Sequence, residues 1–388
     1  MTTLFIAIIF ILYIGLGLPD STFGTALPAM WADLNLPLSL ASVVSLLISI
    51  GTTISAFFSA KLVSKLGTGL VVAISTLLSA ISLIGFYFTN SFWFTCILAF
   101  PLGLGAGAID SAMNSYVASR YSSTVMSFMH CFYGIGVSIT PFIFSWTLSF
   151  NNDWRSGYFL IFFIQLAIAI LAFIVIPFWN KQNLPNVKRE DVDYIDVSYS
   201  RMAKSSAIRA VWVAFFATCA LEFTCDVWGA SYLVFQGLSE SRAAGFITLY
   251  YIGITVGRFL SGVLNAKISP EKVTIIGYVC IALGIGLLLL PLPALYKGIG
   301  LTFIGLGNGP TFPNLTYLTP EHFGKNASAS LVASQMVASN LGIMIVPPVL
   351  GLVFDATSIK LFPVFLLITF VFLALYTILY FKRPKNSL

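Results

Sequence analysis

The sequence predicts an all-α membrane protein with twelve transmembrane helices in two six-helix bundles. Hydrophobic residues make up 58% of the 388-residue chain and charged residues only 9%, whereas a soluble domain carries about 25% charged residues. The apolar residues form unbroken runs of about 20 residues, which is the length of a helix that crosses a bilayer. Strands of a membrane barrel would alternate apolar and polar residues instead. In lipid, only helices and closed β-barrels satisfy all backbone hydrogen bonds, so the unbroken apolar runs predict helices.

Turn and charge signals at the ends of the apolar runs predict the twelve helices in order. The first six are expected over residues 3–31, 38–62, 67–88, 92–119, 122–150 and 154–179. The second six are expected over residues 208–235, 242–264, 272–292, 295–318, 327–354 and 361–380. The predicted domains are an N-terminal bundle over 1–179, a cytoplasmic linker over 180–206 and a C-terminal bundle over 207–388. The first run is too long for the apolar part of a signal peptide, so it is expected to be the first transmembrane helix.

The distribution of positive charge predicts the orientation. Of the 20 Lys and Arg residues, 15 lie in loops expected on one side of the membrane, four lie on the other side, and Arg258 lies within a helix. Loops rich in Lys and Arg stay in the cytoplasm. Both termini and the linker are therefore expected to be cytoplasmic, with the protein in the plasma membrane. The net charge of +6 follows from this topology, and no nucleic acid partner is expected.

The two halves of the chain share a repeat that predicts the two bundles. The stretch that ends at Lys65 recurs as the stretch that ends at Lys267, and GLGAG at 103–107 recurs as GLGNG at 305–309 with the same offset. A Gly and Pro pair also recurs after a small insertion, first as Gly136 and Pro141 and then as Gly342 and Pro347. Parallel repeats of this kind are one building plan of membrane transporters.

Polar residues within the predicted helices of the first half are candidate functional groups. An ionisable side chain near the bilayer centre costs about 2.5–3.5 kcal/mol on insertion scales, so it indicates function. Asp20 follows Pro19, which weakens the helix and frees carbonyl groups. Asp110 and Asn114 share one helical face with two glycines. His130 offers both a donor and an acceptor. The alternatives are that the first helix ends early at Asp20, and that the other side chains only join neighbouring helices.

The second half contains a second group of candidates. Glu222 and Asp226 are one helical turn apart, so their like charges repel unless one is protonated or paired with a cation. Arg258 is the cation available within the predicted helices. A proton-binding site is one interpretation. The alternatives are a structural ion pair, a position of Asp226 near the outer interface, and an Arg258 side chain that extends to the membrane surface.

Aromatic and amide side chains form a third group, which would suit a sugar although such residues more often serve packing. The members are Tyr116, Trp228, Tyr232, Asn314, Gln335 and Asn340. The five cysteines show no CxxC spacing and are expected to be packing residues, without disulfides, metals or cofactors. No HExxH or GxSxG motif occurs, and the two histidines lie on different helices, so an enzyme is not expected.

The motifs together resemble the fucose:proton symporter family of the major facilitator superfamily. The resemblance is carried by LPDSTFGTALP with Asp20, GLGAGAIDSAMN with Asp110 and Asn114, MHCFYGIG with His130, LEFTCDVWGASYL with Glu222, GRFLSG with Arg258, and GPTFPN. It implies the superfamily fold, and it implies that Asp20 and Asp110 serve proton coupling and sugar binding. It does not extend to the loop after the second helix, where Ser64 and Lys65 stand in place of an Asp and a basic residue, so no charge latch is expected there.

These observations predict a proton-coupled symporter of a small polar solute, a monosaccharide, that works as a monomer by alternating access. Its partners would be the solute, protons and the lipid bilayer, with the proton gradient as energy source. Proton coupling is assigned to Asp20, Asp110 and Glu222. Substrate binding is assigned to Asp20, Asn114, His130, Glu222, Asp226, Trp228, Arg258, Asn314 and Asn340. Proton-driven efflux of drugs or lipophilic solutes, and a lipid flippase, remain alternatives, and a membrane-embedded enzyme is a more remote one.

Overall fold

Helices form nearly all of the computed structural model, which describes residues 2–121, 123–151, 153–181, 198–324 and 327–382. The first half contains α1 Thr2–Asp20, α2 Thr22–Leu34, α3 Leu38–Leu66, α4 Thr68–Phe88, α5 Phe92–Arg120, α6 Ser123–Asn151, α7 Trp154–Ile174 and α8 Ile176–Lys181. The second half contains α9 Tyr199–Met202, α10 Ser206–Phe235, α11 Glu240–Leu264, α12 Pro270–Leu289, α13 Ala294–Asn308, α14 Thr311–Phe323, α15 Ser328–Ala356, η1 Ile359–Leu361 and α16 Phe362–Phe381. Most of the predicted linker lies outside the described residues.

Within the described residues, eleven helical segments are long and apolar enough to cross a membrane, so the chain is a multi-pass membrane protein. One predicted helix, over 295–318, is divided into α13 with 15 residues and α14 with 13 residues. Neither piece alone reaches the length of about 20 residues that a bilayer needs. The division falls at Pro310, which has no backbone N–H and cannot continue the hydrogen bonding of α13.

The first membrane segment is interrupted where Pro19 predicted a weak point. α1 ends at Asp20 and α2 begins at Thr22, although the apolar segment Leu4–Leu34 is continuous. The freed carbonyl oxygens find hydroxyl donors, because Thr22 donates to the Pro19 carbonyl at 2.6 Å and Thr140 of α6 donates to the Leu18 carbonyl at 2.7 Å. Asp20 therefore lies at a break inside the membrane segment and not at its end.

The helices of the two halves, α1 to α7 and α10 to α16, make equivalent contacts, and we call these two sets the helix groups. Equivalent pairs pack in both groups: α3 with α5 matches α11 with α13, and α1 with α6 matches α10 with α15. A Cβ added at Gly103 would lie 2.0 Å from the Ile48 carbonyl oxygen, and one at Gly305 would lie 2.2 Å from that of Tyr250. The repeated glycines therefore mark the same close backbone contact in each half.

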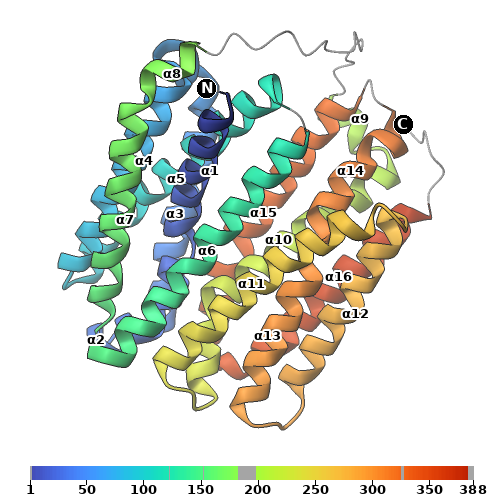
Figure 1. Cartoon of the computed structure of the whole chain (residues 1–388). Helices are drawn as coiled ribbons and strands as arrows, with labels where there is room; N and C mark the ends of the chain where they lie inside the picture. The colour runs from blue at the N-terminus through green and yellow to red at the C-terminus, as the bar shows by residue number, and fades with distance from the viewer. Residues whose placement is uncertain (1, 122, 152, 182–197, 325–326, 383–388) are drawn as a thin grey trace.

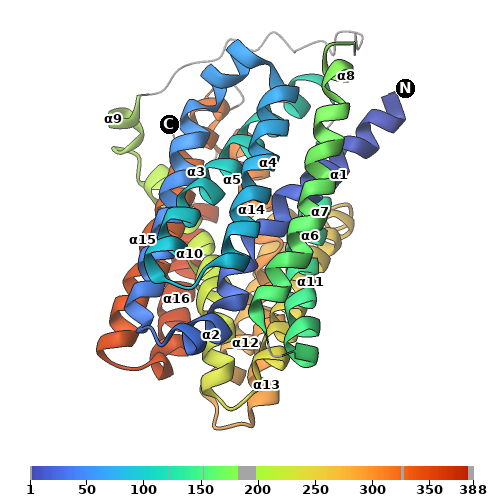
Figure 2. The ribbon, with the colours of Figure 1, turned by 90° about the vertical axis from the view of Figure 1, so that its left-hand side faces the viewer.

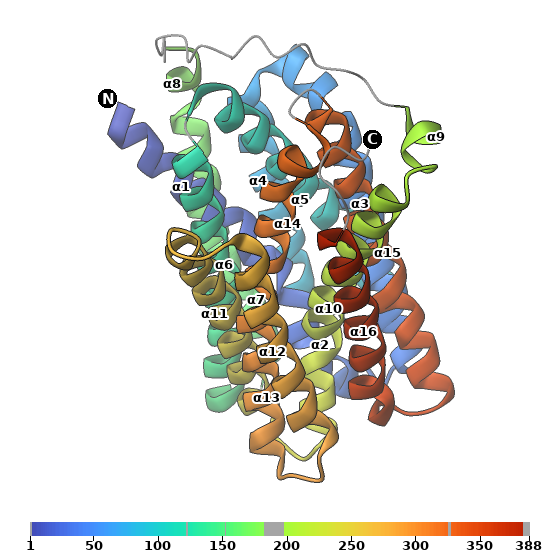
Figure 3. The same cartoon turned by 90° about the vertical axis from the view of Figure 1, so that its right-hand side faces the viewer.

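Figure 1 shows that the beginning of α1, the end of α16, α8 and α9 lie at one end of the molecule, which we call the terminal end. The turn between α12 and α13 lies at the opposite end, which we call the distal end (Figure 3). Between the two groups, α6 packs on α11, α3 on α15 and α2 on α10. The pair α3 and α15 runs side by side in Figure 2.

Three close contacts join the two groups toward the distal end. The Ser241 hydroxyl donates to the Ser145 carbonyl at 2.7 Å. A Cβ added at Gly351 of α15 would lie 1.7 Å from the Ser42 hydroxyl of α3. A Cβ added at Gly24 of α2 would lie 2.2 Å from the backbone oxygen of residue 226 on α10. We call these three contacts the distal seal, because only small side chains allow the helices to approach so closely.

Candidate functional site

A hydrogen-bonded cluster of α1, α5 and α6 side chains lies in the interior of the first group. The Tyr13 hydroxyl donates to Asp110 Oδ1 at 2.7 Å, and the Asn114 amide donates to the same oxygen at 2.8 Å and to the Tyr13 hydroxyl at 2.9 Å. His130 Nε2 lies 3.2 Å from the Asn114 carbonyl oxygen. We call Tyr13, Asp110, Asn114 and His130 the first cluster. It brings together three side chains that the sequence predicted.

Asp110 combines a membrane position with access to water. It lies in the segment Phe92–Asn114, yet its side chain is exposed. Its partners Tyr13 and Asn114 are neutral, and among the described residues no Lys, Arg or His nitrogen comes within 4 Å of it. A carboxyl group with neutral partners that both donate and accept can be accommodated with or without its proton.

The second predicted carboxyl, Asp20, lies beside the first cluster. The Tyr133 hydroxyl of α6 donates to Asp20 Oδ2 at 2.5 Å. The Tyr133 ring contacts the Tyr13 ring edge to face, with 6.3 Å between the centroids. The carboxyls of Asp20 and Asp110 are close enough to interact electrostatically. Both predicted acidic residues of the first half therefore belong to one polar region.

A matching cluster lies in the second group, on α10, α11 and α13. Arg258 Nη2 lies 3.3 Å from Glu222 Oε1, and the Asn308 amide donates to Glu222 Oε2 at 3.0 Å. The Thr218 hydroxyl in turn donates to the Asn308 carbonyl oxygen at 2.8 Å. We call Thr218, Glu222, Arg258 and Asn308 the second cluster. Its ion pair is partly buried, with 17% of the Glu222 and 21% of the Arg258 side chain exposed.

The two clusters face each other across the boundary between the helix groups. Arg258 is close enough to His130 and Tyr133 to interact with them electrostatically, and Glu222 also acts on Tyr133. Charge and hydrogen-bonding groups from both halves therefore surround one central region. The predicted residues that the structure brings together there are Asp20, Asp110, Asn114, His130, Glu222 and Arg258.

Asp226 lies one helical turn beyond Glu222, in a different environment. Its side chain is 4% exposed, and its Oδ1 atom is buried without a hydrogen-bond partner. The described ion pairs do not include it. It lies within electrostatic range of Asp20 and Glu222. As predicted, Glu222 and Asp226 are neighbours on α10, but Arg258 pairs only with Glu222.

Two further predicted binding residues lie in packed surroundings instead. Trp228 is fully buried, donates its indole N–H to the Pro347 carbonyl at 2.8 Å and contacts Phe354 edge to face. Asn314 is buried, and its carbonyl oxygen accepts from Ser261 at 3.1 Å and from Asn265 at 2.8 Å. These contacts join helices of the second group and do not reach either cluster.

The remaining aromatic and amide candidates make other contacts or none that is described. The Tyr116 hydroxyl donates to the Trp179 carbonyl and the Tyr232 hydroxyl to the Leu288 carbonyl. The Gln335 amide donates to the Thr319 hydroxyl at 2.9 Å. Asn340 is exposed on α15. No described hydrogen bond connects these four residues with the two clusters.

Sequence reasoning missed Tyr13, Tyr133, Thr218 and Asn308. Helical spacing was an available signal for two of them, because Tyr133 is three residues after His130 and Thr218 is four residues before Glu222. Asn308 could have been found from the repeat, since the first half has an alanine at the matching position of GLGAG. A polar residue that replaces an apolar one in a repeated membrane motif indicates a local function.

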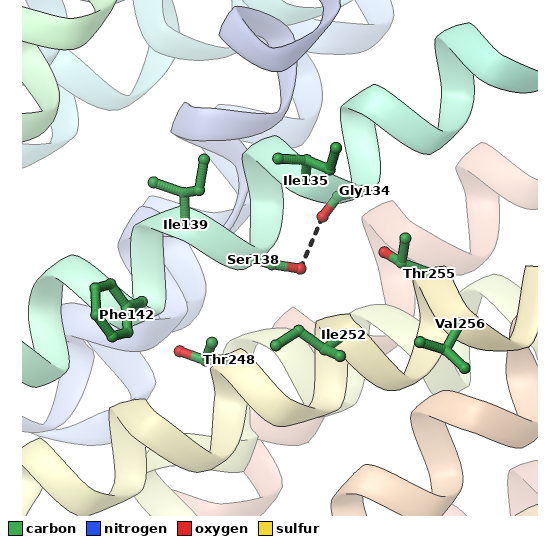
Figure 4. Close-up of a pocket in the computed structure, with 9 residues that line it drawn as sticks. All are labelled: Gly134, Ile135, Ser138, Ile139, Phe142, Thr248, Ile252, Thr255 and Val256. Carbon is green, nitrogen blue, oxygen red and sulfur yellow. Dashed lines mark hydrogen bonds between the residues drawn. The ribbon is translucent and has the colours of Figure 1, made fainter. Parts of the chain in front are cut away.

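A separate pocket of about 340 Å³ lies between α6 and α11 (Figure 4). Aliphatic and aromatic side chains line most of it, among them Ile139 and Phe142. The Ser138 hydroxyl beside it is satisfied by the Gly134 carbonyl at 2.7 Å (Figure 4). None of the predicted site residues lines this pocket.

The described residues contain no group of three His, Cys, Asp or Glu side chains that could hold a metal ion.

Comparison with known proteins identifies relatives over most of the chain. The model of the Major Facilitator Superfamily matches residues 9–347. The chain is 24% identical to Bypass of stop codon protein 6 of Saccharomyces cerevisiae over 76% of its own length and 65% of that protein. It is 22% identical to the glucose/mannose transporter GlcP of Bacillus subtilis over 55% of its length and 53% of that protein. The match thus spans less than two thirds of either relative.

A further relative is matched over more of its length, and a solved structure shares the fold. The cis,cis-muconate transport protein of Acinetobacter baylyi is 23% identical over 87% of this chain and 84% of that protein. The crystal structure of a mutant of the nucleoside transporter NupG superposes with a TM-score of 0.73 at 14% identity, covering 97% of this chain and 98% of that one.

Proposed function

The chain belongs to the Major Facilitator Superfamily, and on this premise we propose that it is a proton-coupled symporter of a small polar solute, a monosaccharide. Its relatives are transporters and not enzymes, as the sequence predicted. The observation that carries the proposal is Asp110, a water-accessible carboxyl within a membrane segment whose described partners are all neutral. Such a group can bind and release a proton during each transport cycle.

The proposed arrangement has twelve membrane crossings, with α13 and α14 together forming the tenth. Two six-helix bundles over 1–179 and 207–388 would move relative to each other around the central clusters. The terminal end would face the cytoplasm, because most of the Lys and Arg residues belong to the loops expected there. The protein would act as a monomer in the plasma membrane.

In the proposed mechanism, Asp110 takes up the proton. A neutral Asp110 no longer attracts the Asn114 amide and the Tyr13 hydroxyl as strongly, so both groups become available to the solute. Asp20 and His130 would then hold solute hydroxyls, since a carboxylate accepts hydrogen bonds and a neutral imidazole both donates and accepts.

The second cluster would complete the binding region from the other bundle. Arg258 neutralises Glu222, so we propose that this pair orients hydrogen-bond donors toward the solute and does not carry the proton. Asn308 and Thr218 would extend the set of hydrogen-bonding groups. The name of the relative GlcP supports a sugar as the solute.

Proton flux in proteoliposomes tests the proposal. Addition of the transported monosaccharide from a panel should make the outside medium alkaline, because protons enter with the solute. Asp110→Asn keeps the size of the side chain and removes the titratable group, so it should abolish the response. If no sugar moves protons, sugar symport is excluded, and lipophilic solutes and lipids become the next candidates.

Arg258 favours an organic carboxylate as a second candidate solute. Its guanidinium is partly exposed, faces the other bundle and could bind a carboxylate with two hydrogen bonds. The name of the muconate transport relative agrees with this class. The same flux assay with a panel of small dicarboxylates separates the candidates, because Arg258→Lys should greatly weaken carboxylate uptake, whereas sugar uptake depends less on this geometry.

A further inference from the structure

Asp226 is an acidic residue that the proposed mechanism does not use. It is 4% exposed, within the membrane segment Ser206–Phe235, and its Oδ1 atom has no hydrogen-bond partner. A buried charge is tolerated when it is paired or hydrogen-bonded. The Tyr251 hydroxyl interacts with this carboxyl, but Oδ1 stays without a donor, so burial favours the neutral, protonated form.

Among the described residues, no Lys, Arg or His nitrogen pairs with this carboxyl. Five titratable side chains lie within electrostatic range of it: Tyr250 and Tyr251 on α11, Asp20 on α1, and Glu222 and Cys225 on α10. Arg258 is paired with Glu222. Lys297 of α13, which also packs near α10, donates to the carbonyls of Leu288 and Leu290. A negative charge at residue 226 would thus meet the acids Asp20 and Glu222 and no cation, with the Tyr251 hydroxyl as the donor described for it.

The backbone of Asp226 is also part of the distal seal. A Cβ added at Gly24 would lie 2.2 Å from the Asp226 carbonyl oxygen and 2.9 Å from Val227 Cα. α2, which carries Gly24, lies in the first half of the chain and α10 in the second, and the two helices pack directly on each other. This backbone contact beside the buried Asp226 side chain therefore lies between the two halves of the chain, which must separate at the distal end in alternating access.

We propose that Asp226 is a proton-sensitive latch of the distal seal, which closes over the neutral carboxyl and opens when the carboxyl loses its proton. The inference rests on the proton-coupled transport proposed above. It adds a second proton-binding residue to that mechanism, with a role that differs from the role of Asp110. Asp110 carries the proton with the solute. Asp226 makes closure of the distal end depend on a proton taken from that side.

The link between charge and opening follows from burial. Deprotonation inside the closed seal leaves a carboxylate without a cation and without a partner for Oδ1, so the closed state loses stability relative to the open one. Separation of α2 from α10 gives the carboxylate water. One titrating group can change the ratio of open to closed molecules by at most about tenfold per pH unit.

Cysteine accessibility tests the latch directly. The reporter is Ser42→Cys, which is buried in the seal against Gly351, in a background without the five native cysteines. A membrane-impermeant maleimide is applied from the distal side at acidic to alkaline pH. Labelling of Ala356→Cys, exposed at the distal end of α15, corrects for the intrinsic pH dependence of thiol reactivity. The corrected rate for Ser42→Cys should rise several-fold with pH.

Asp226→Asn should give a low rate that no longer changes with pH, because the amide cannot become charged. Asp110→Asn is the matched control: it should lose proton-driven transport and retain the pH dependence of labelling. No solute is needed, so the assay can be read even if the proposed symport fails. A flat response in the parent protein, or the same response in Asp226→Asn, would overturn the proposal.

Protein stability supplies a second readout. Asp226→Asn in detergent should melt at the same temperature as the parent at acidic pH and at a higher temperature at alkaline pH, since the charge is then absent. If Asp226→Asn does not fold, the same labelling is measured with Asp226→Ser. A lower melting temperature at alkaline pH for a folded neutral variant would contradict the latch.

Discussion

At the scale of single residues, Tyr13 is the side chain on which the first cluster depends. Its hydroxyl donates to Asp110 and accepts from Asn114, so it connects the proposed proton carrier with a proposed solute ligand. The ring is fully buried, so the hydroxyl is held in a fixed position. A phenol can accommodate the carboxyl in both protonation states, which a charged partner could not do.

Tyr13→Phe should therefore impair transport without unfolding the protein. A hydrogen bond to a charged group contributes about 1.5–3 kcal/mol, so kcat/KM for uptake should fall by about tenfold to a hundredfold. Tyr158→Phe is the control, because Tyr158 is also buried and its hydroxyl interacts with Thr22, which belongs to neither cluster. Equal effects of the two substitutions on uptake kinetics would argue against a role of the Tyr13 hydroxyl.

The Glu222–Arg258 pair permits a prediction about stability. Glu222→Gln and Arg258→Gln each leave a partly buried charge without its partner, which costs about 3–5 kcal/mol for a fully buried pair and less here because both ends retain some water. The double variant contains neither charge and should be more stable than either single variant. Melting temperatures in detergent provide the measurement. Additive losses in the double variant would show that the two charges do not compensate each other.

At the scale of helices, the sequence predicted where most helices lie, but it predicted only one of two breaks within them. The break between α1 and α2 could be predicted because Pro19 removes a hydrogen bond within an otherwise regular apolar run. The break before α14 was missed, although Pro310 is present, because the apolar pattern continues across it. Proline weakens a helix at a known place, but the surrounding packing decides whether the helix separates there.

The repeated glycines permit a prediction at this scale. Gly305→Val should destabilise the contact of α13 with α11, because a Cβ there would lie 2.2 Å from the backbone oxygen of Tyr250. Overpacking of this kind costs about 1–3 kcal/mol, and rigid backbone atoms leave little room for relief. Gly262→Val on α11 is the control, since nothing lies within 4 Å of its added Cβ. Similar melting temperatures for the two variants would contradict the assignment.

At the scale of the whole molecule, the sequence predicted the helical membrane fold and the repeat but only part of the candidate site. Asp20, Asp110 and Glu222 could be found because charges are rare in membrane segments. Their partners could not, because Tyr13 and Asp110 are 97 positions apart in the chain and only packing of α1 against α5 and α6 brings them together. Trp228 and Asn314 resemble binding residues in sequence, yet their hydrogen bonds join helices.

The central claim is that Asp110 couples the solute to the proton, and one measurement separates coupling from binding. In proteoliposomes, the parent protein should accumulate the solute when a proton gradient is imposed and should also exchange labelled for unlabelled solute without a gradient. Asp110→Asn should retain a measurable exchange, because the binding region stays in place, and should lose accumulation. Accumulation by Asp110→Asn at the parent level would contradict the claim and would move proton coupling to another residue.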